Sequence, residues 1–158
     1  DSVEHWKAVE MKLLDGKVLE SNFQNLYLNL LSLISNAKDA SLPAHDVKYI
    51  KKEAILGISP DQINANTERT LIGISRALAF VQLRCGVIKL SDVPYLLMLL
   101  PLAYVLEDDK YWAKEGTFKK LEFWYWGSLF TGRYRERQNE KCVQDVESVF
   151  QWLCMLQH

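Results

Sequence analysis

Three arginines and a tyrosine form the densest basic cluster in the chain. Its members are Arg133, Tyr134, Arg135 and Arg137, which follow Gly132 at the end of an aromatic run. Guanidinium groups match the geometry of phosphate oxygens, and a tyrosine ring can stack on a nucleic-acid base. We therefore take these four residues as the candidate nucleic-acid-binding site.

The same side chains also have a structural interpretation. Arginines just after a helix can satisfy its last carbonyl groups and interact with the negative end of its dipole. Arg133 can equally pair with a carboxylate such as Asp145, which would fix the turn against the last helix. We favour a structural role of this kind for Arg133 and Tyr134. For Arg135 and Arg137 we expect a solvated surface.

Two tryptophans, Trp124 and Trp126, lie in the aromatic run that precedes this cluster. On a helix their spacing separates them by about 200°, so they cannot share one face. One ring can therefore be buried while the other meets another helix or a partner domain. We take both as candidate interface residues, because an exposed tryptophan is typical of a protein interface.

Residues with catalytic or metal-binding potential are scattered along the chain. The three histidines, His5, His45 and His158, have no metal-binding spacing, and the sequence contains no nucleophile elbow or glycine-rich phosphate loop. The three cysteines include no Cys-x-x-Cys pair, which favours buried thiols over zinc ligands or disulfides. We therefore expect no metal, no cofactor and no enzyme activity in this chain.

Apolar residues recur at helical spacing over most of the chain, and no stretch alternates for long enough to predict a strand. The run Ser59-Pro60-Asp61-Gln62 combines a cap, a first-position proline and a capping-box glutamine, so it predicts the start of a long helix. Thr117 and Asn139 are expected to cap the aromatic helix and the last helix. Gly132 is expected to end the aromatic helix.

The most apolar stretch covers residues 93–106 and contains no charge in fourteen positions. A membrane-spanning helix needs about 20 apolar residues, so this stretch predicts a buried central helix instead of a span. Pro101 lies inside it and is expected to kink it. The predicted fold is all-α, a single compact domain over residues 1–158 with about six to eight helices around a buried central helix.

Length and charge narrow the class of protein further. A chain of 158 residues with a formal net charge of -1 fits one ordinary globular domain and argues against wholesale phosphate binding. No signal peptide is visible, so we expect a cytoplasmic protein. The absence of an initiator methionine indicates a piece of a longer protein.

Several short motifs follow one another in a set order over residues 66–152. They are Leu90-x-x-Val93-Pro94-Tyr95, Leu99-Leu100-Pro101-Leu102-Ala103, Trp124-x-Trp126, Phe130-x-Gly132-Arg133-Tyr134, Asp145 and Trp152. In this order and spacing they resemble the helical region of the GmrSD-type family, also known as domain of unknown function 262. The better-known members of that family are modification-dependent (type IV) restriction endonucleases.

The resemblance implies a connecting domain and no catalytic one. In such proteins an N-terminal ParB-like domain uses nucleoside triphosphate and carries an Asp-Gly-Gln-Gln-Arg signature, and a C-terminal His-Asn-His nuclease often follows. This sequence contains neither motif. The partners implied are the neighbouring ParB-like and nuclease domains of the parent protein, with DNA as a further candidate.

Three functional hypotheses follow. The first is a non-catalytic helical linker or regulatory domain of a GmrSD-like DNA restriction or phage-defence protein. The second is a nucleic-acid-binding helical module that uses the cluster from Arg133 to Arg137. The third is an all-α protein-interaction scaffold, which a contiguous apolar patch around an exposed Trp124 or Trp126 would favour.

Overall fold

The computed structural model describes residues 17–37 and 46–155. Apolar residues at helical spacing after a possible Ser2 cap predict a first helix through roughly Leu14. This helix and all three histidines lie outside the described residues. The described chain forms six α-helices and three 3-10 helices and contains no strand, which confirms the all-α fold. In chain order the elements are α2 (Lys17–Ser35), η1 (Val47–Ile50), α3 (Lys52–Leu56), α4 (Pro60–Arg84), η2 (Leu90–Asp92), η3 (Leu96–Met98), α5 (Leu99–Leu106), α6 (Glu115–Phe130) and α7 (Gln138–Met155).

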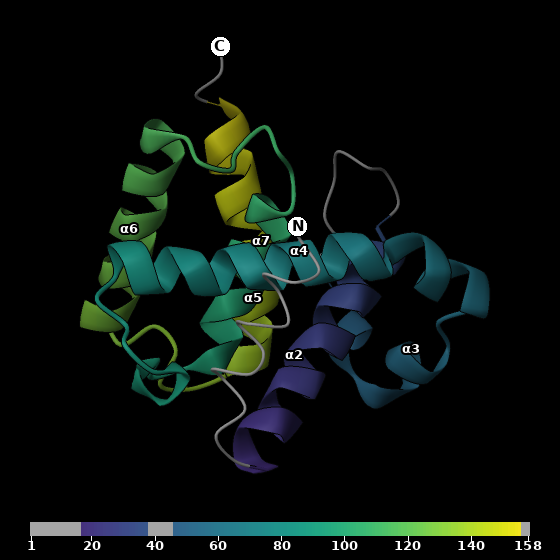
Figure 1. The fold of residues 1–158 in the computed structure, drawn as a ribbon. Helices are drawn as coiled ribbons and strands as arrows, with labels where there is room; N and C mark the ends of the chain where they lie inside the picture. Colours follow the sequence, from purple (N-terminus) through teal and green to yellow (C-terminus); the bar gives the residue numbers. More distant parts are fainter. Residues whose placement is uncertain (1–16, 38–45, 156–158) are drawn as a thin grey trace.

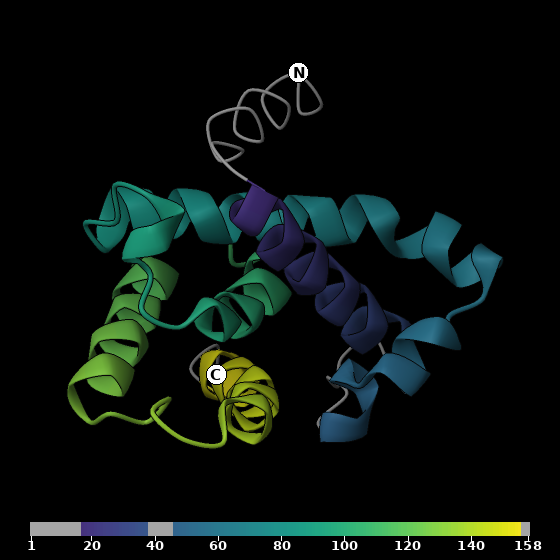
Figure 2. The same cartoon turned by 90° about the horizontal axis from the view of Figure 1, so that it is seen from below.

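The helices are arranged around α5. In Figure 1 the long helix α4 crosses the molecule and α5 lies behind its middle. Figure 2, seen from below, shows α5 between α4 and α7. Helix α2 packs against both α4 and α5. Helices α6 and α3 lie at opposite ends of the molecule in both views, so α6 is a peripheral helix.

Helix α5 is the buried central helix that the sequence predicted. All eight of its residues are buried, as expected for a helix that is apolar all round. None of the helices in the described part of the chain combines the length and hydropathy of a membrane span. The apolar stretch does not form one helix, however, because the 3-10 turn η3 precedes α5.

The position of Pro101 differs from the expectation. Helix α5 begins at Leu99, so Pro101 occupies its first turn and not its interior. The backbone N–H groups of a first turn have no partner within the helix. A proline therefore removes no i→i−4 hydrogen bond at this position, and the expected cause of a kink is missing.

Helix α4 begins as predicted at the Ser59 capping box. The Ser59 hydroxyl accepts from Gln62 N at 3.2 Å, and Gln62 Oε1 accepts from Ser59 N at 3.0 Å. Further along, Arg69 forms two hydrogen bonds to the carboxylate of Glu107, of 2.7 and 3.2 Å. Arg76 donates to the Leu106 carbonyl at 2.9 Å. These arginines fix the end of α5 against α4.

The starts of α6 and α7 are corrected by the structure. Helix α6 begins at Glu115 after Lys114, so Thr117 lies inside it and is buried. Arg84 of α4 binds the Glu115 carboxylate at 2.8 and 2.9 Å, and this tertiary contact fixes a first turn that precedes Thr117. Helix α7 begins at Gln138, so Asn139 belongs to its first turn and does not cap it.

Candidate interaction site

The turn that follows α6 begins with a left-handed glycine, as predicted. Gly132 has a φ of 67°, a left-handed conformation that glycine adopts without steric cost. Gly132 N donates to Leu129 O at 3.2 Å, and Arg133 N donates to Ser128 O at 3.1 Å. This is the Schellman pattern, in which backbone donors satisfy the last carbonyl groups of a helix. The arginine side chains are not needed for that purpose.

Arg133 and Tyr134 both bind Asp145 of α7. Arg133 Nη2 donates to Oδ1 at 2.7 Å, and Arg133 Nε lies 3.0 Å from each carboxylate oxygen. Tyr134 Oη donates to Oδ2 at 2.6 Å. Tyr134 and Asp145 are buried, and Arg133 is half-buried. The structure therefore contains the pairing of Arg133 with Asp145 that the sequence analysis favoured.

The surroundings of Tyr134 keep it in its neutral form. The Tyr95 ring stacks on it with centroids 6.2 Å apart, and the Trp124 ring meets it edge-on at 6.4 Å. Burial, together with the charge of Asp145, raises the pKa of Tyr134 far above its ordinary value. Hydrogen bonding to Asp145 raises the pKa of the Arg133 guanidinium. A phosphate would have to displace Asp145 to reach Tyr134 Oη or the Nε and Nη2 donors of Arg133.

Arg135 and Arg137 have a different environment. Both are exposed, and neither forms an ion pair with a residue that the structure describes. The Arg135 side chain lies over Gly132, where an added Cβ would be 2.7 Å from Arg135 Nε. Of the four residues of the candidate nucleic-acid-binding site, Arg133 and Tyr134 thus bind inside the fold, and Arg135 and Arg137 face solvent.

Trp124 and Trp126 lie on different sides of α6, as their spacing predicted. Trp124 is half-buried against Tyr134, and its indole Nε1 is buried without a hydrogen-bond partner among the described residues. Trp126 is 40% exposed. Trp126 is therefore the better interface candidate of the two, while Trp124 belongs to the edge of the core.

Exposed rings continue from Trp126 along the same face of α6. Phe123 and Phe130 are 76% and 81% exposed and lie one turn before and one turn after Trp126. The Trp126 and Phe130 rings stack with centroids 5.9 Å apart, and Phe123 contacts Trp152 of α7 at 6.3 Å. We call these four residues the aromatic stripe. The sequence analysis did not single out Phe123 and Phe130 as interface residues, although their spacing from Trp126 contained the signal.

The carboxylates of α6 are already paired. Glu115 and Glu122 both accept hydrogen bonds from Arg84, and the Arg84 Nη2 to Glu115 Oε1 distance is 2.8 Å. Hydrogen bonding to Arg84 lowers the pKa of Glu115 below its ordinary value, so this carboxylate stays ionised near neutral pH. Arg84 of α4 therefore holds both carboxylates of α6 and offsets one of their two negative charges.

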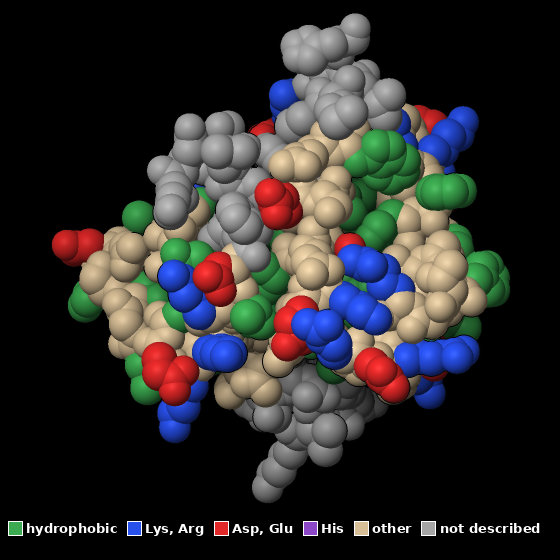
Figure 3. Space-filling model, turned by 180° about the vertical axis from the view of Figure 1, so that it is seen from behind, with side chains coloured by type: hydrophobic (Ala, Val, Ile, Leu, Met, Phe, Trp, Pro, Cys, Tyr) green, Lys and Arg blue, Asp and Glu red, His purple; other side chains and the backbone are tan. Residues whose placement is uncertain are grey.

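The other cations around the aromatic stripe form no salt bridge with a described residue, although the charge of Lys119 helps to lower the pKa of Glu115. Five lysines and arginines in residues 114–137 form no ion pair with a described residue. Glu136 is the one carboxylate of this segment without such a pair. Figure 3 shows hydrophobic side chains along the edge of the molecule that α6 forms, with Lys and Arg side chains gathered beside them. The surface is aromatic and basic. The unpaired cations are Lys114, Lys119, Lys120, Arg135 and Arg137.

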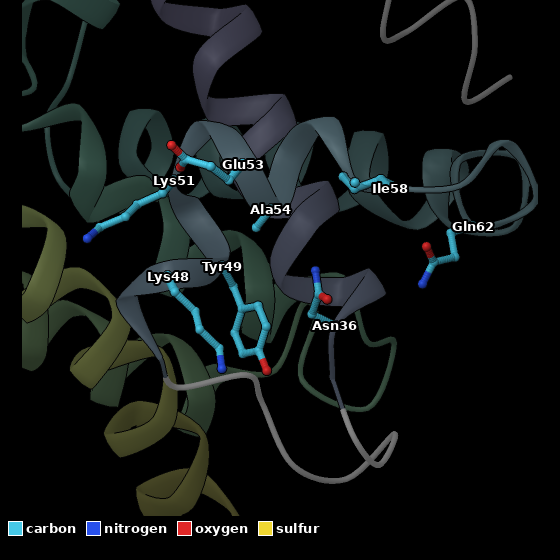
Figure 4. A pocket seen from close by; sticks show the side chains of 9 residues that line it. Asn36, Lys48, Tyr49, Lys51, Glu53, Ala54, Ile58 and Gln62 are labelled. Carbon is cyan, nitrogen blue, oxygen red and sulfur yellow. The ribbon is translucent and has the colours of Figure 1, made fainter.

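Two cavities lie near α3, away from the aromatic stripe. The first has a volume of 410 Å³ and is shown in Figure 4. Lys48 pairs with Asp46 at 3.8 Å and lies over the Tyr49 ring, whereas Lys51 points in another direction. These cations do not converge, so the cavity is not built for an anion. The second cavity, of 640 Å³, lies between α2, α3 and η3 and is lined mainly by leucine and isoleucine.

Metal-binding and nucleophilic groups do not assemble into a site in the part of the chain that the structure describes. No three His, Cys, Asp or Glu side chains there are close enough to hold a metal ion. Cys85 and Cys142 are free and buried, and burial raises the pKa of both thiols. Raised thiol pKa values leave little thiolate at neutral pH, so neither cysteine is an activated nucleophile.

Comparison of the chain with protein-family models, with curated proteins and with solved structures found no match. The resemblance to the GmrSD-type family therefore rests on the order of short motifs alone. A functional proposal has to start from the geometry of the site.

Proposed function

We propose that this chain is a non-catalytic helical interaction domain and that the aromatic stripe is the surface with which it binds another protein domain. The observation that carries the proposal is the exposure of Phe123, Trp126 and Phe130 on one face of α6. Contiguous apolar surface is unfavourable in water, and on soluble proteins it marks interaction sites. Aromatic residues are also enriched where protein interfaces are most strongly bound.

The proposed setting is a GmrSD-like DNA restriction or phage-defence protein, in which this domain links or regulates the ParB-like and nuclease domains. Support comes from the way the motif residues pack together. Trp124 and Tyr95 pack on Tyr134, and Asp145 binds Tyr134. Motifs that are separate in the sequence form one packed unit, which gives their order a physical reason. A linking domain of this kind needs no catalytic group of its own.

The full-length gene product tests this proposal. The double variant Phe123→Ser/Phe130→Ser removes two exposed rings. We expect it to lose co-purification with separately expressed ParB-like and nuclease domains of the same gene. We also expect it to lose protection against phage. Leu56→Ser is the matched control, because Leu56 is 74% exposed and lies on α3 at the opposite end of the molecule. A gene without such domains would contradict the proposed setting. DNA cleavage by the isolated chain would contradict the non-catalytic role.

Nucleic-acid binding is a second candidate function, and the exposure of Arg135 and Arg137 favours it. Binding through these two residues would weaken steeply with salt and would fall in the Arg135→Ala and Arg137→Ala variants. Anisotropy of a labelled oligonucleotide, titrated with the chain at several salt concentrations, measures both effects. No binding of the oligonucleotide would exclude this function, and binding that neither salt nor these variants change would exclude Arg135 and Arg137 as its site.

A further inference from the structure

Helix α6 is apolar on two sides. Its inner side packs into the core through Leu121 and Tyr125, which are buried. Its outer side presents Phe123, Trp126 and Phe130 to solvent. A helix at the periphery of a domain ordinarily carries polar residues on its outer face. The outer face of α6 therefore has the composition of a contact surface.

The rings of the aromatic stripe form two contacting pairs along one face of α6. Trp126 and Phe130 stack on each other at an interplanar angle of 25°, and Phe123 lies against Trp152. Along α6 the stripe extends over about 10 Å, since an α-helix rises about 1.5 Å per residue. This length is two helical turns. It matches the i, i+3, i+7 anchors by which an amphipathic helix binds an apolar face.

The charges beside the aromatic stripe limit which partners can bind to it. Unpaired Lys119 lies at one end of the exposed face, and unpaired Arg135 and Arg137 follow its other end. A second copy of the chain, bound through the same face, would bring these cations against each other. A partner with acidic residues beside its apolar stripe would be complementary, because lysines and arginines outnumber carboxylates in residues 114–137.

We infer that the aromatic stripe binds an amphipathic helix whose apolar residues recur at i, i+3 and i+7 and whose flanking positions are Asp or Glu. This inference rests on the proposed interaction function and adds the chemistry of the partner. The apolar residues of the partner cover Phe123, Trp126 and Phe130. Its carboxylates pair with Lys119 at one end and with Arg135 and Arg137 at the other.

Two other classes of partner fit this surface less well. Single-stranded nucleic acid stacks its bases on free ring faces, whereas Trp126 and Phe130 turn their faces toward each other. Helices that lie on a membrane surface have a strongly polar face opposite the apolar one, whereas the side of α6 opposite the aromatic stripe is buried through Leu121 and Tyr125. Both classes therefore serve as comparisons in the test.

Three labelled peptides of about 15 residues, long enough to form a helix, provide the probes. The first carries leucine at i, i+3 and i+7 with glutamate beside it, the second replaces each glutamate by lysine, and the third scrambles the first. Fluorescence anisotropy, with the whole chain as titrant, measures their affinities. We expect the acidic peptide to bind at least about tenfold more tightly than the other two, because both charge and apolar register must match.

Variants of the chain assign the binding to the aromatic stripe. The double variant Trp126→Ala/Phe130→Ala is expected to bind the acidic peptide about tenfold more weakly. The double variant Arg135→Glu/Arg137→Glu is expected to prefer the basic peptide over the acidic one. Phe130→Ala alone is a second test, since this ring is 81% exposed and contributes little to the fold. Leu56→Ser should leave the affinity unchanged. Circular dichroism checks that each variant is folded.

The inference is overturned if the acidic peptide binds no better than its scrambled form, or if a thymidine oligonucleotide or phosphatidylserine vesicles bind this face more tightly. The proposed function is distinguished by the co-purification experiment. If the peptides fail but Phe123→Ser with Phe130→Ser still releases a partner domain, only the chemistry of the partner is wrong. If neither experiment responds to the aromatic stripe, both proposals fall.

Discussion

Tyr134 Oη donates a hydrogen bond of 2.6 Å to Asp145 Oδ2, and both residues are buried. Arg133 approaches the same carboxylate and contacts both of its oxygens. The turn after α6 is thereby attached to α7 by one carboxylate with donors from two consecutive residues. A buried charge that is fully hydrogen-bonded stabilises a fold only as long as all partners remain.

Removal of this carboxylate is the first prediction. Asp145→Ala leaves the Arg133 guanidinium and the Tyr134 hydroxyl without an acceptor, so we expect the free energy of unfolding to fall by about 3 kcal/mol. The value lies at the lower end for buried pairs, because the Arg133 side chain is 35% exposed and partly screened by water. Urea unfolding at pH 7, followed by circular dichroism, measures the change.

The control for this prediction is Tyr134→Phe. It keeps the ring in its packing against Tyr95 and Trp124 and removes one donor, while Arg133 still binds Asp145. The expected loss is about 1.5 to 2 kcal/mol, because the acceptor is charged. Equal losses in Asp145→Ala and Tyr134→Phe would show that Arg133 contributes nothing to the attachment.

The sequence predicted this turn because its contacts are local. Gly132 ends α6 through backbone conformation, and Arg133 reaches an acid only 12 residues further along the chain. The central helix was predictable for a similar reason, because an uninterrupted apolar stretch has no solvated face. The contact of Phe123 with Trp152 was not predictable, since it depends on how α6 and α7 pack.

Pro101 shows that the start of a helix is also difficult to predict from the sequence. The apolar composition of residues 93–106 does not reveal where the helix begins, and a proline is damaging or neutral according to that boundary. The start at Leu99 follows the 3-10 turn η3, and the packing of Met98 in the core fixes that turn. Caps with strong local signals, such as Ser59, were predictable because they need no tertiary contact.

A pair of glycines provides the second prediction. At Gly73 of α4 an added Cβ would lie 2.6 Å from the Ala103 carbonyl oxygen of α5, so Gly73→Ala must push two helices apart. We expect a net loss of about 1 to 2 kcal/mol, although alanine is the better helix former. Gly127 of α6 has no heavy atom within 4 Å of such a Cβ. Gly127→Ala should stabilise the protein by about 0.5 to 1 kcal/mol.

Urea unfolding of both alanine variants at one pH checks this contrast. Opposite signs are expected, because the two sites share helix propensity and differ in the space around the added methyl group. A stabilising Gly73→Ala would mean that α4 and α5 can separate at no cost. The close approach of Gly73 to Ala103 would then be unimportant for the fold.

Alkaline pH is the subject of the third prediction. Burial raises the pKa of Tyr125 and of Cys85 to about 12. The ordinary pKa values are about 10 for tyrosine and about 8.5 for cysteine, so the unfolded chain loses these protons first. Above these values the folded state binds more protons than the unfolded state, and the free energy of unfolding falls as pH rises. The contribution is fully present below about pH 8.5.

The decrease of the unfolding free energy with rising pH can be assigned to individual residues. Each such group lowers the free energy of unfolding by up to about 1.4 kcal/mol per pH unit between its unfolded and folded pKa values. Tyr125→Phe should therefore flatten the curve between about pH 10 and 12, and Cys85→Ala should flatten it from about pH 8.5. Urea unfolding from pH 7 to 11 measures the curves. An unchanged slope in both variants would show that these groups titrate normally in the fold.

The fourth prediction concerns Arg84, which connects α4 to α6. Arg84→Gln leaves Glu115 and Glu122 without their cation, while the length of the side chain is nearly kept. We expect the backbone amides of α6 to exchange hydrogen faster, because the helix is peripheral and loses its ion pairs with α4. The two freed carboxylates lie on the helix that carries the aromatic stripe. These carboxylates should weaken the binding of the acidic peptide about threefold by repulsion.

Arg69→Gln is the matched control for this substitution. Arg69 lies on the same helix and binds Glu107, which belongs to the end of α5 and not to α6. Hydrogen exchange read by mass spectrometry, together with peptide anisotropy, compares the two variants. Arg84→Gln should change both measurements at α6, whereas Arg69→Gln should change exchange only near α5. Equal peptide affinities in the two variants would mean that Arg84 holds α6 in place but does not set the charge of the surface that α6 presents.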